Sequence, residues 1–184
     1  MIRLATRADI PAILDIYAPY VQDTAVSFEY SVPTLAEFTE RFLGITAQFP
    51  WLVWEEQGKI LGYAYGSLPF GRAAYRWVAA SSIYLHPSIQ GKGIGSRLYD
   101  ALEAILTCQG YRKTYAIITS DNPGSLEFHQ RRGFRILGEF PDCGVKFHKL
   151  YSVVWMEKTL ISDGIPHNFP ESIDRIVNVD RFFS

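Results

Sequence analysis

The sequence lacks the features that mark secreted, membrane-embedded and nucleic-acid-binding proteins. Only two of its 184 residues are cysteines, Cys108 and Cys143, too few for the disulfide framework of a small secreted domain, so we expect a reducing compartment. The 18 Lys and Arg are matched by 19 Asp and Glu, a net charge of −1, which excludes the broad positive field that recruits nucleic acids. No apolar run approaches the roughly 18 residues of a membrane span. We therefore predict a soluble, cytoplasmic protein with no nucleic-acid or membrane partner.

The residues that are present give the composition of an ordinary globular protein. Hydrophobic residues make up 48% and charged residues 20%, a balance too apolar for a disordered chain. The length fits one compact domain. Aromatic residues are plentiful at 15%, and a rich core, an aromatic pocket or a buried interface would each explain them.

Hydrophobic periodicity divides the chain into two regions. The first ends in a hairpin with Gly58-Lys59 at its turn, and the second, from residue 78, alternates strand and helix. This alternation predicts parallel strands joined by right-handed crossovers. The expected elements are a strand at 2–5, a helix from Ile10 to Val21, a helix between the capping box Thr34–Glu37 and Pro50, strands at 51–57 and 60–68, a loop at 69–77, a strand at 81–86, a helix near 93–109, a strand at 113–119, a helix near 122–132, and strands at 134–140 and 150–158.

A polar tail, residues 161–184, follows the last strand. It contains Gly164, Pro166 and Pro170, together with apolar residues that suit packing. We expect an ordered appendage rather than a second domain, packed either on its own subunit or on another. The apolar residues are Ile173, Ile176, Val177 and Val179.

The most informative segment is a glycine-rich stretch between a strand and a helix. Its glycines let the backbone approach a ligand, and the first amides of the helix favour a phosphate or pyrophosphate. Its spacing fits neither the P-loop nor the dinucleotide fingerprint. Taken alone, it is also compatible with a turn that binds nothing. The segment consists of Gln90, Gly91, Lys92, Gly93, Ile94, Gly95, Ser96 and Arg97.

A second motif, Asn122-x-x-Ser125-x-x-x-His129-x-x-x-Gly133-Phe134, follows one strand later. Together with Gln90-x-x-Gly93-x-Gly95, it resembles the acyl-CoA site of the GNAT superfamily of N-acyltransferases. Within that superfamily, residues 2–158 are similar to the phosphinothricin and methionine sulfoximine acetyltransferases. Four further segments carry this similarity: Phe28-Glu29, Tyr75-x-Trp77, Ser82-Ile83-Tyr84-Leu85-His86-Pro87 and Val153-x-Trp155-Met156.

The resemblance implies an α/β (α+β) fold, a GNAT-type mixed, splayed β-sheet flanked by helices on both faces, with residues 1–160 as the acyl-CoA N-acyltransferase domain. It also implies that acetyl-CoA, a co-substrate, enters between the strands at 82–86 and 113–119. Backbone N–H groups around Tyr84 and Leu85 would polarise the acyl oxygen. The implied acetyl-CoA contacts are Ile83, Tyr84, Leu85, residues 90–97, Asn122 and Ser125.

The catalytic acid and base are less well defined. His129 stands where many relatives carry a tyrosine acid, and an imidazole titrating near neutral pH suits that task; the alternative is a histidine that only packs. The resemblance places the usual general base, a glutamate, where this chain has Ala80. Glu29 is the nearest alternative base or ammonium ligand unless it is an ordinary exposed carboxylate, and a water chain ending on Tyr84 or Ser82 is another.

The candidate acceptor site draws on the same regions. Arg72 and Tyr75 suit a substrate carboxylate, because a guanidinium matches two oxygens, although a surface arginine is the alternative. Tyr63 and Tyr65 alternate along one strand and therefore share a face, where they either line the pocket or pack in the core. The predicted substrate-binding residues are Phe28, Glu29, Arg72, Tyr75 and Ala80; no metal site is predicted, because no cluster has ligand spacing.

We therefore predict an enzyme that transfers the acetyl group of acetyl-CoA directly to the amino group of a small amino acid or an analogue of the phosphinothricin type. A homodimer is expected from the resemblance and the aromatic surplus. Two alternatives stay open. The acceptor is another amine, such as a polyamine or a protein N-terminus, or the domain binds acyl-CoA without catalysis.

Overall fold

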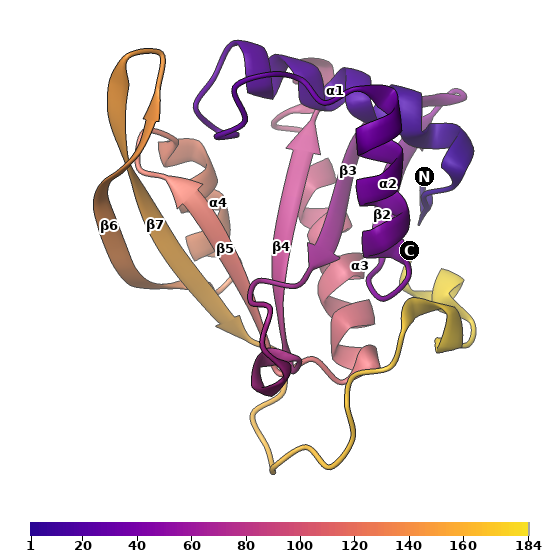
Figure 1. Ribbon diagram of the computed structural model, residues 1–184. Coiled ribbons are helices and arrows are strands. Elements are labelled where there is room, and N and C mark those ends of the chain that lie inside the picture. The colour runs from indigo at the N-terminus through magenta and orange to yellow at the C-terminus, as the bar shows by residue number, and fades with distance from the viewer. Residues whose placement is uncertain (184) are drawn as a thin grey trace.

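The computed structural model describes residues 1–183 and centres on one seven-stranded sheet with the order β1-β2-β3-β4-β5-β7-β6 (Figure 1). Of the paired strands in this range, only β4 and β5 run parallel to each other. The strands are β1 (Ile2–Leu4), β2 (Trp51–Glu56), β3 (Lys59–Ser67), β4 (Val78–Leu85), β5 (Lys113–Thr119), β6 (Arg135–Lys146) and β7 (Lys149–Thr159).

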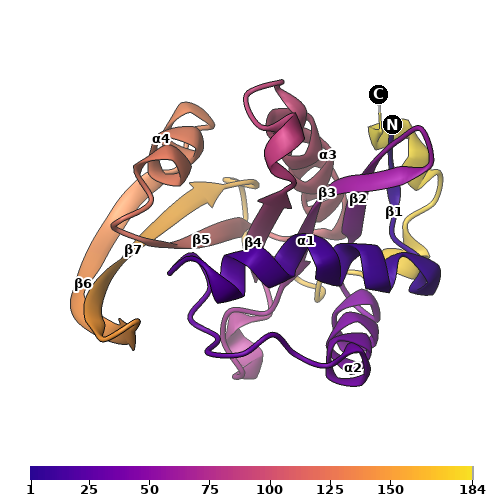
Figure 2. The ribbon, with the colours of Figure 1, turned by 90° about the horizontal axis from the view of Figure 1, so that it is seen from above.

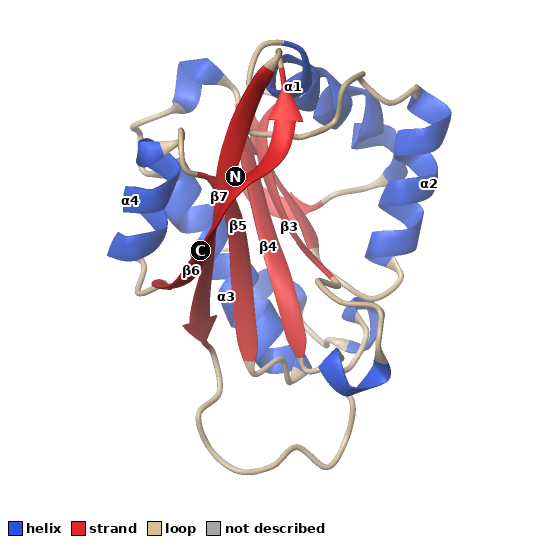
Figure 3. Cartoon of the chain, turned by 60° about the vertical axis from the view of Figure 1, so that its left-hand side comes forward, coloured by secondary structure: helices blue, strands red, loops and turns tan. Residues whose placement is uncertain are grey.

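Four α-helices cover the sheet in residues 1–183. Helices α1 and α2 lie on one side, and α3 and α4 lie on the other (Figures 2 and 3). The predicted mixed α/β sheet with helices on both faces is confirmed. The helices are α1 (Ile10–Gln22), α2 (Leu35–Thr46), α3 (Ile94–Gln109) and α4 (Pro123–Arg131), with short 3-10 turns at Arg7–Asp9, Ala73–Tyr75, Pro87–Ile89, Ile173–Arg175 and Val179–Phe182.

Each helical layer is attached by an apolar stripe that its sequence encodes. Ile13 of α1 and Phe38 of α2 are buried against Trp51 of β2 on one face of the sheet. On the other face, Leu98 and Leu102 of α3 are fully buried against the strands. Two separate cores therefore hold the sheet in place, one on each side.

The local signals for helix and turn formation are confirmed. The backbone N–H of Thr34 donates to the Glu37 carboxylate at 2.7 Å, and the Glu37 N–H donates back to Oγ1 of Thr34 at 3.3 Å, which is the predicted capping box. The β2–β3 hairpin turns at Gly58, whose φ of +75° is readily adopted by glycine.

The sheet splits where β4 meets β5. Only three residue pairs join them, from Val78 with Lys113 to Ala80 with Tyr115, although both strands continue beyond these pairs. We call β1–β4 the inner half of the sheet and β5–β7 the outer half. The predicted splay is present, and it opens a gap between the two halves.

The sequence was wrong about the third strand of the alternating region. The strand predicted at 134–140 is not paired in parallel with β5, because β7 lies between β5 and β6 and is antiparallel to both. β6 also extends to Lys146, with irregular register at Gly138 and between Phe140 and Gly144. Glycine and proline here produce bulges rather than an end to the strand.

The tail packs on its own subunit. Trp77 Nε1 donates to the Asn168 carbonyl at 3.0 Å, and Gln109 Nε2 donates to the Glu171 carbonyl at 2.7 Å. Beyond these contacts, Ile173 packs against the core under α3. The chain after β7 is therefore bound along one end of the domain.

Candidate active site

The gap between the two halves is lined by backbone groups of β4. In an antiparallel pair, every second residue exchanges both its hydrogen bonds with the partner strand. The N–H of His86 donates to the Leu61 carbonyl of the β3 side at 2.8 Å, so Tyr84, two residues earlier, also directs its backbone toward β3. Ile83 and Leu85, one residue out of step, direct their N–H and C=O groups into the gap.

This alternation corrects one expectation. The backbone N–H of Tyr84 is committed to the β3 ladder and does not face the gap, because the pleat turns successive amides to opposite edges of a strand. The amides of Ile83 and Leu85 are the ones on the gap side. At Leu85 the hydroxyl of Tyr20 is already present, donating to the carbonyl at 2.6 Å and accepting from the N–H at 3.4 Å.

The glycine-rich segment lies at the head of α3, beside the gap. Gly91 and Gly93 have φ values of +75° and +78°, and Gly93 forms the N-cap of the helix. The amides that open α3 have no partner within the helix, so they form the kind of anion site predicted. Lys92 is exposed, whereas the guanidinium of Arg97 lies 4.8 Å from the ring centre of Trp54.

A cavity of about 300 Å³ connects these parts. Tyr20, Leu85 and Gln90 line one side, and Asn122 and Ser125 of the second motif line the other. The Asn122 side chain caps α4 by accepting the N–H of Ser125 at 3.1 Å. The structure thus brings the glycine-rich segment, the gap-facing strand and the start of α4 to one place.

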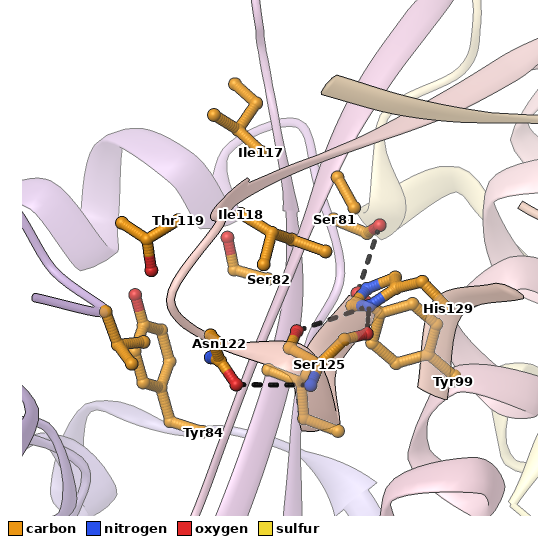
Figure 4. A pocket seen from close by; sticks show the side chains of 13 residues that line it. Ser81, Ser82, Tyr84, Tyr99, Ile117, Ile118, Thr119, Asn122, Ser125 and His129 are labelled. Atoms are coloured by element: carbon orange, nitrogen blue, oxygen red, sulfur yellow. Dashed lines mark hydrogen bonds between the residues drawn. The ribbon is translucent and has the colours of Figure 1, made fainter. Parts of the chain in front are cut away.

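His129 lies at the inner end of the gap and is almost completely buried, with 3% exposure (Figure 4). Its Nδ1 donates to the Ser125 carbonyl at 2.7 Å, and its Nε2 lies 2.8 Å from the hydroxyl of Tyr99. Because a carbonyl only accepts, Nδ1 carries a proton, and the Tyr99 hydroxyl that partners Nε2 also donates to Oγ of Ser81 at 3.3 Å. Both ring nitrogens of His129 are therefore occupied by hydrogen bonds.

Burial lowers the pKa of His129 below its ordinary value of 6.5, and the positive charge of Arg132 lowers it slightly further, against the opposing effect of the hydrogen bond to Ser125. This differs from the imidazole titrating near neutral pH that the sequence suggested. The residue does line the gap beside Ser81 and Ser82. Its position therefore suits a catalytic acid, whereas its lowered pKa disfavours the protonated form that an acid needs.

A second group of side chains lies on the opposite face of β4, toward α1 and α2. Ala80, Ser82 and Tyr84 share this face because side chains alternate along a strand. Tyr84 packs edge-on against Tyr17 of α1, with ring centres 5.1 Å apart, and burial raises the pKa of its hydroxyl well above the usual 10. Tyr84 is thus a phenol that keeps its proton at neutral pH.

The two strand tyrosines have different roles. Tyr63 is only 1% exposed and belongs to the core. Tyr65 lies opposite Ser82 in the β3–β4 register and stacks on Trp51 with ring centres 4.1 Å apart. Burial raises its pKa. Tyr65 is the less buried of the two and lies across from a residue of the gap-lining strand.

Glu29 is held in this second group by two partners. The hydroxyl of Tyr17 donates to its Oε2 at 3.1 Å, and the Arg41 guanidinium donates to its Oε1. The carboxylate is about one-third exposed. The carboxylate can bind an ammonium group, but part of its negative charge is already neutralised by the ion pair with Arg41. Phe28, beside it, covers Gly144 of β6.

Arg72 and Tyr75 lie in the segment between β3 and β4, around a short 3-10 turn where a loop was expected. Tyr75 is 45% exposed and packs on Phe70, with ring centres 4.7 Å apart. Phe70 in turn stacks on Trp155 of β7 at 5.7 Å. Arg72 is exposed, and its predicted contact with a substrate carboxylate stays a prediction.

Several side chains of the site escaped the sequence analysis. Tyr20, Arg41 and Tyr99 each contact a predicted residue, yet each resembles an ordinary helix residue in the sequence. A hint existed in α1, where Tyr17 and Tyr20 are three residues apart and so lie on neighbouring positions of the helix surface.

Two features are absent from residues 1–183. No group of three or more His, Cys, Asp or Glu side chains is arranged to hold a metal ion. None of the helices in the same range has the length and apolar character that crossing a membrane requires.

Comparison with known proteins adds to this geometry. A family model described as an acetyltransferase (GNAT) domain matches residues 2–155. The chain is 36% identical over 163 residues to a phosphinothricin N-acetyltransferase of Alcaligenes faecalis, covering 86% of this chain and 82% of that one. It is 33% identical over 169 residues to an L-methionine sulfoximine/L-methionine sulfone acetyltransferase of Salmonella typhimurium, covering 90% and 97%. A crystal structure of a GNAT superfamily phosphinothricin acetyltransferase from Sinorhizobium meliloti in complex with acetyl-CoA superposes with a TM-score of 0.84 at 34% identity, covering 88% of each chain.

Proposed function

Because the chain belongs to the GNAT acetyltransferase family and is an N-acetyltransferase, we propose that it moves the acetyl group of acetyl-CoA directly to the amino group of a small amino acid or an analogue. The observation that carries this proposal is the gap between β4 and β5, which joins a glycine-rich anion site to the face that bears Glu29. The names of the relatives support an acceptor of the phosphinothricin or methionine sulfoximine kind.

The residues of the gap fit acetyl-CoA. Amides at the head of α3, between Gly91 and Ser96, suit its pyrophosphate, and Lys92 adds a nearby positive charge. The gap-facing N–H and C=O groups of Ile83 and Leu85 suit the amides of its pantetheine arm. Asn122 and Ser125 face the same cavity and would border that arm.

The reaction requires a neutral amine. Its lone pair attacks the thioester carbonyl, the carbon–sulfur bond breaks, and the proton lost by nitrogen balances the charge of the leaving thiolate. A gap-facing amide of β4 stabilises the negative charge on the acyl oxygen. Glu29 would hold the incoming ammonium group or take its proton, and the Tyr84 phenol would act only as a donor.

His129 keeps its proposed role as the acid for the thiolate only if it first gains a proton. The lowered pKa restricts the protonated fraction at neutral pH, so this step would depend on pH. Arg72 and Tyr75 would bind the carboxylate of an amino-acid acceptor, and Phe28 would contact its side chain.

The proposal includes a homodimer in the cytoplasm that needs no nucleic acid, membrane or metal. The outer half supports dimerisation, because Ile117 of β5 and Phe140 of β6 are 49% and 52% exposed on the sheet side that α1 and α2 leave uncovered. The two free, exposed cysteines support a reducing compartment. Light scattering of the purified protein tests the dimer.

The deciding experiment is a thiol-release assay with acetyl-CoA against a panel of amines: phosphinothricin, methionine sulfoximine, common amino acids, a polyamine and a peptide N-terminus. We expect release with the first three classes. Release with the polyamine or the peptide alone would show that the acceptor is that kind of amine and not an amino acid. Calorimetric binding of acetyl-CoA without release on any amine would support a domain that only binds acyl-CoA.

A further inference from the structure

Lys146, the last residue of β6, is a buried lysine with an unusual set of partners. It is 2% exposed, and its ammonium group donates to three backbone carbonyls: Val21 at 2.6 Å, Thr24 at 2.7 Å and Ser27 at 2.7 Å. An ammonium group has three N–H donors, so all of them are used. No carboxylate of residues 1–183 forms a salt bridge with it.

The three carbonyls belong to the other half of the molecule. They lie at the end of α1 and in the segment that leads to α2, whereas Lys146 lies at the tip of the β6–β7 hairpin. In Figure 1 this segment reaches from α1 toward the hairpin, across the open end of the gap. Lys146 therefore ties the outer half of the sheet to the segment over the inner half.

Two neighbouring contacts repeat this connection. The hydroxyl of Tyr30 donates to the Val145 carbonyl at 2.6 Å. The ring of Phe28 lies so close over Gly144 that a Cβ there would approach Cε2 of Phe28 to 2.2 Å. Three consecutive residues of β6 thus contact one segment, and the segment is fixed at several points.

The segment that Lys146 holds also positions Glu29. The side-chain oxygen of Ser27 accepts the N–H of Glu29 at 3.2 Å and lies 2.7 Å from the hydroxyl of Tyr17, which itself donates to the Glu29 carboxylate. Because Lys146 binds the carbonyl of the same Ser27, its contacts pass to Glu29 through one residue.

We propose that Lys146 is a positioning residue for the acceptor site: its ammonium group clamps the segment 21–29 across the gap and thereby sets the place of Glu29. This inference rests on the proposed role of Glu29 in binding the acceptor amine. It predicts that loss of the clamp weakens use of the acceptor more than binding of acetyl-CoA, because the glycine-rich segment at the head of α3 lies outside the clamped segment.

The test is Lys146→Met, which keeps most of the side-chain length and removes the donors. We expect kcat/KM for the acceptor to fall about 10- to 100-fold, mainly through KM, because small displacements of positioning groups have effects of this size. The Kd for acetyl-CoA should stay within about twofold. Lys59→Met, which removes a lysine from the exposed β2–β3 turn, is the matched control and should behave as wild type.

A readout independent of turnover separates this inference from the proposed function. Hydrogen exchange of the amides in 24–30 should speed up in Lys146→Met and not in Lys59→Met. Unchanged exchange there overturns the clamp whatever the activity, and an unchanged acceptor KM in an active enzyme overturns the link to Glu29. Failure of the wild type on every amine would count against the proposed function and leave the exchange result to decide the clamp.

If Lys146→Met does not fold, Tyr30→Phe is the second variant. It removes the hydrogen bond from the exposed Tyr30 hydroxyl to the Val145 carbonyl and should give the same changes, smaller in size.

Discussion

The inner and outer halves of the sheet are built differently. In the inner half, helices cover both faces, and Leu52 of β2 and Ala79 of β4 are fully buried. In the outer half, α4 covers one face, while Ile117 and Phe140 are about half exposed on the other. The site lies where these two bodies part. The thinner cover of the outer half begins at the strand, β5, that parts from β4 after three residue pairs.

The largest expected difference concerns stability. Leu52→Ala removes a fully buried side chain and should lower the free energy of unfolding by about 2–5 kcal/mol, whereas Ile117→Ala, at 49% exposure, should cost about 1 kcal/mol or less in the monomer. Urea unfolding of both variants at low protein concentration measures this. Equal losses would mean that the outer half is as tightly packed as the inner half.

The next largest effect is a loss of affinity for acetyl-CoA on substitution of Gly93 in the glycine-rich segment. Gly93→Val places a β-branched side chain at a φ of +78° with open space around its Cβ, so the fold survives while the backbone of the anion site is strained. We expect affinity for acetyl-CoA to fall by about 100-fold or more, about 2.7 kcal/mol. Calorimetry gives the affinity.

Gly58→Val is the control for this variant. Gly58 has a φ of +75° and equally open space around its Cβ, but it lies in the β2–β3 turn. Valine there causes the same backbone strain at a place where acetyl-CoA is not expected to bind. If both variants bind acetyl-CoA as wild type does, the glycine-rich segment is only a turn.

The third prediction concerns Ala80 of β4, on the inner side of the gap, and the pH dependence of the rate. Ala80 lies on the same face as Ser82 and beside Tyr115 of β5. If Glu29 only holds the ammonium group and takes no proton, the native enzyme depends on acceptor that is already neutral, and its rate should keep climbing with pH toward the amine pKa. Ala80→Glu supplies a base and should flatten that climb, raising kcat/KM near neutral pH by up to about 100-fold.

The pH profile of kcat/KM distinguishes the outcomes for Ala80. A folded Ala80→Glu variant that binds acetyl-CoA and gains nothing, together with a loss of activity in Glu29→Gln, would assign the base to Glu29. An identical pH profile in all three proteins would exclude both positions.

The smallest effect is a pH dependence of stability that arises from His129 of α4, in the outer half. The folded state lowers the pKa of His129, so below its ordinary value of 6.5 the unfolded chain binds a proton that the folded chain refuses. Stability is therefore complete above about pH 6.5 and falls as pH falls, by at most about 1.4 kcal/mol per pH unit. His129→Gln should flatten the unfolding free energy between about pH 5 and 7, whereas His167→Gln, in the exposed tail, should not.

The same variant tests catalysis. If His129 delivers the proton to the thiolate, His129→Gln lowers kcat and leaves the affinity for acetyl-CoA nearly unchanged. Wild-type kcat across the pH range would leave His129 with its packing role beside Tyr99.

The sequence predicted the inner half better than the outer half, for a physical reason. Helix periods, the capping box at Thr34 and the turn at Gly58 are local signals, and they survive in the fold. The order β5-β7-β6 depends on which strand fills the place beside β5, and residue alternation carries no such information. Pro141 and Gly144 resemble strand breakers, yet β6 continues through them as a bulged strand.

The site divides in the same way. The glycine-rich segment and the Asn122 motif each lie within a few residues, so their chemistry could be inferred directly. The neighbours of Glu29 could not, because Arg41 and Tyr17 come from different helices, and Lys146 reaches Val21 from 125 residues away. Neither the lowered pKa of His129 nor the orientation of the Tyr84 amide can be deduced without the register and burial of their strands and helix.

The parting of β4 and β5 has a thermodynamic consequence. It leaves a sheet with one interior edge, where the backbone groups of Ile83 face the gap and those of Leu85 are hydrogen-bonded to the Tyr20 hydroxyl. Acetyl-CoA would bind in this gap, and a ligand that binds only the folded state adds RT ln(1 + [L]/Kd) to its stability, about 2.7 kcal/mol at a hundredfold excess over Kd. The melting temperature of this protein should accordingly rise with the concentration of its co-substrate.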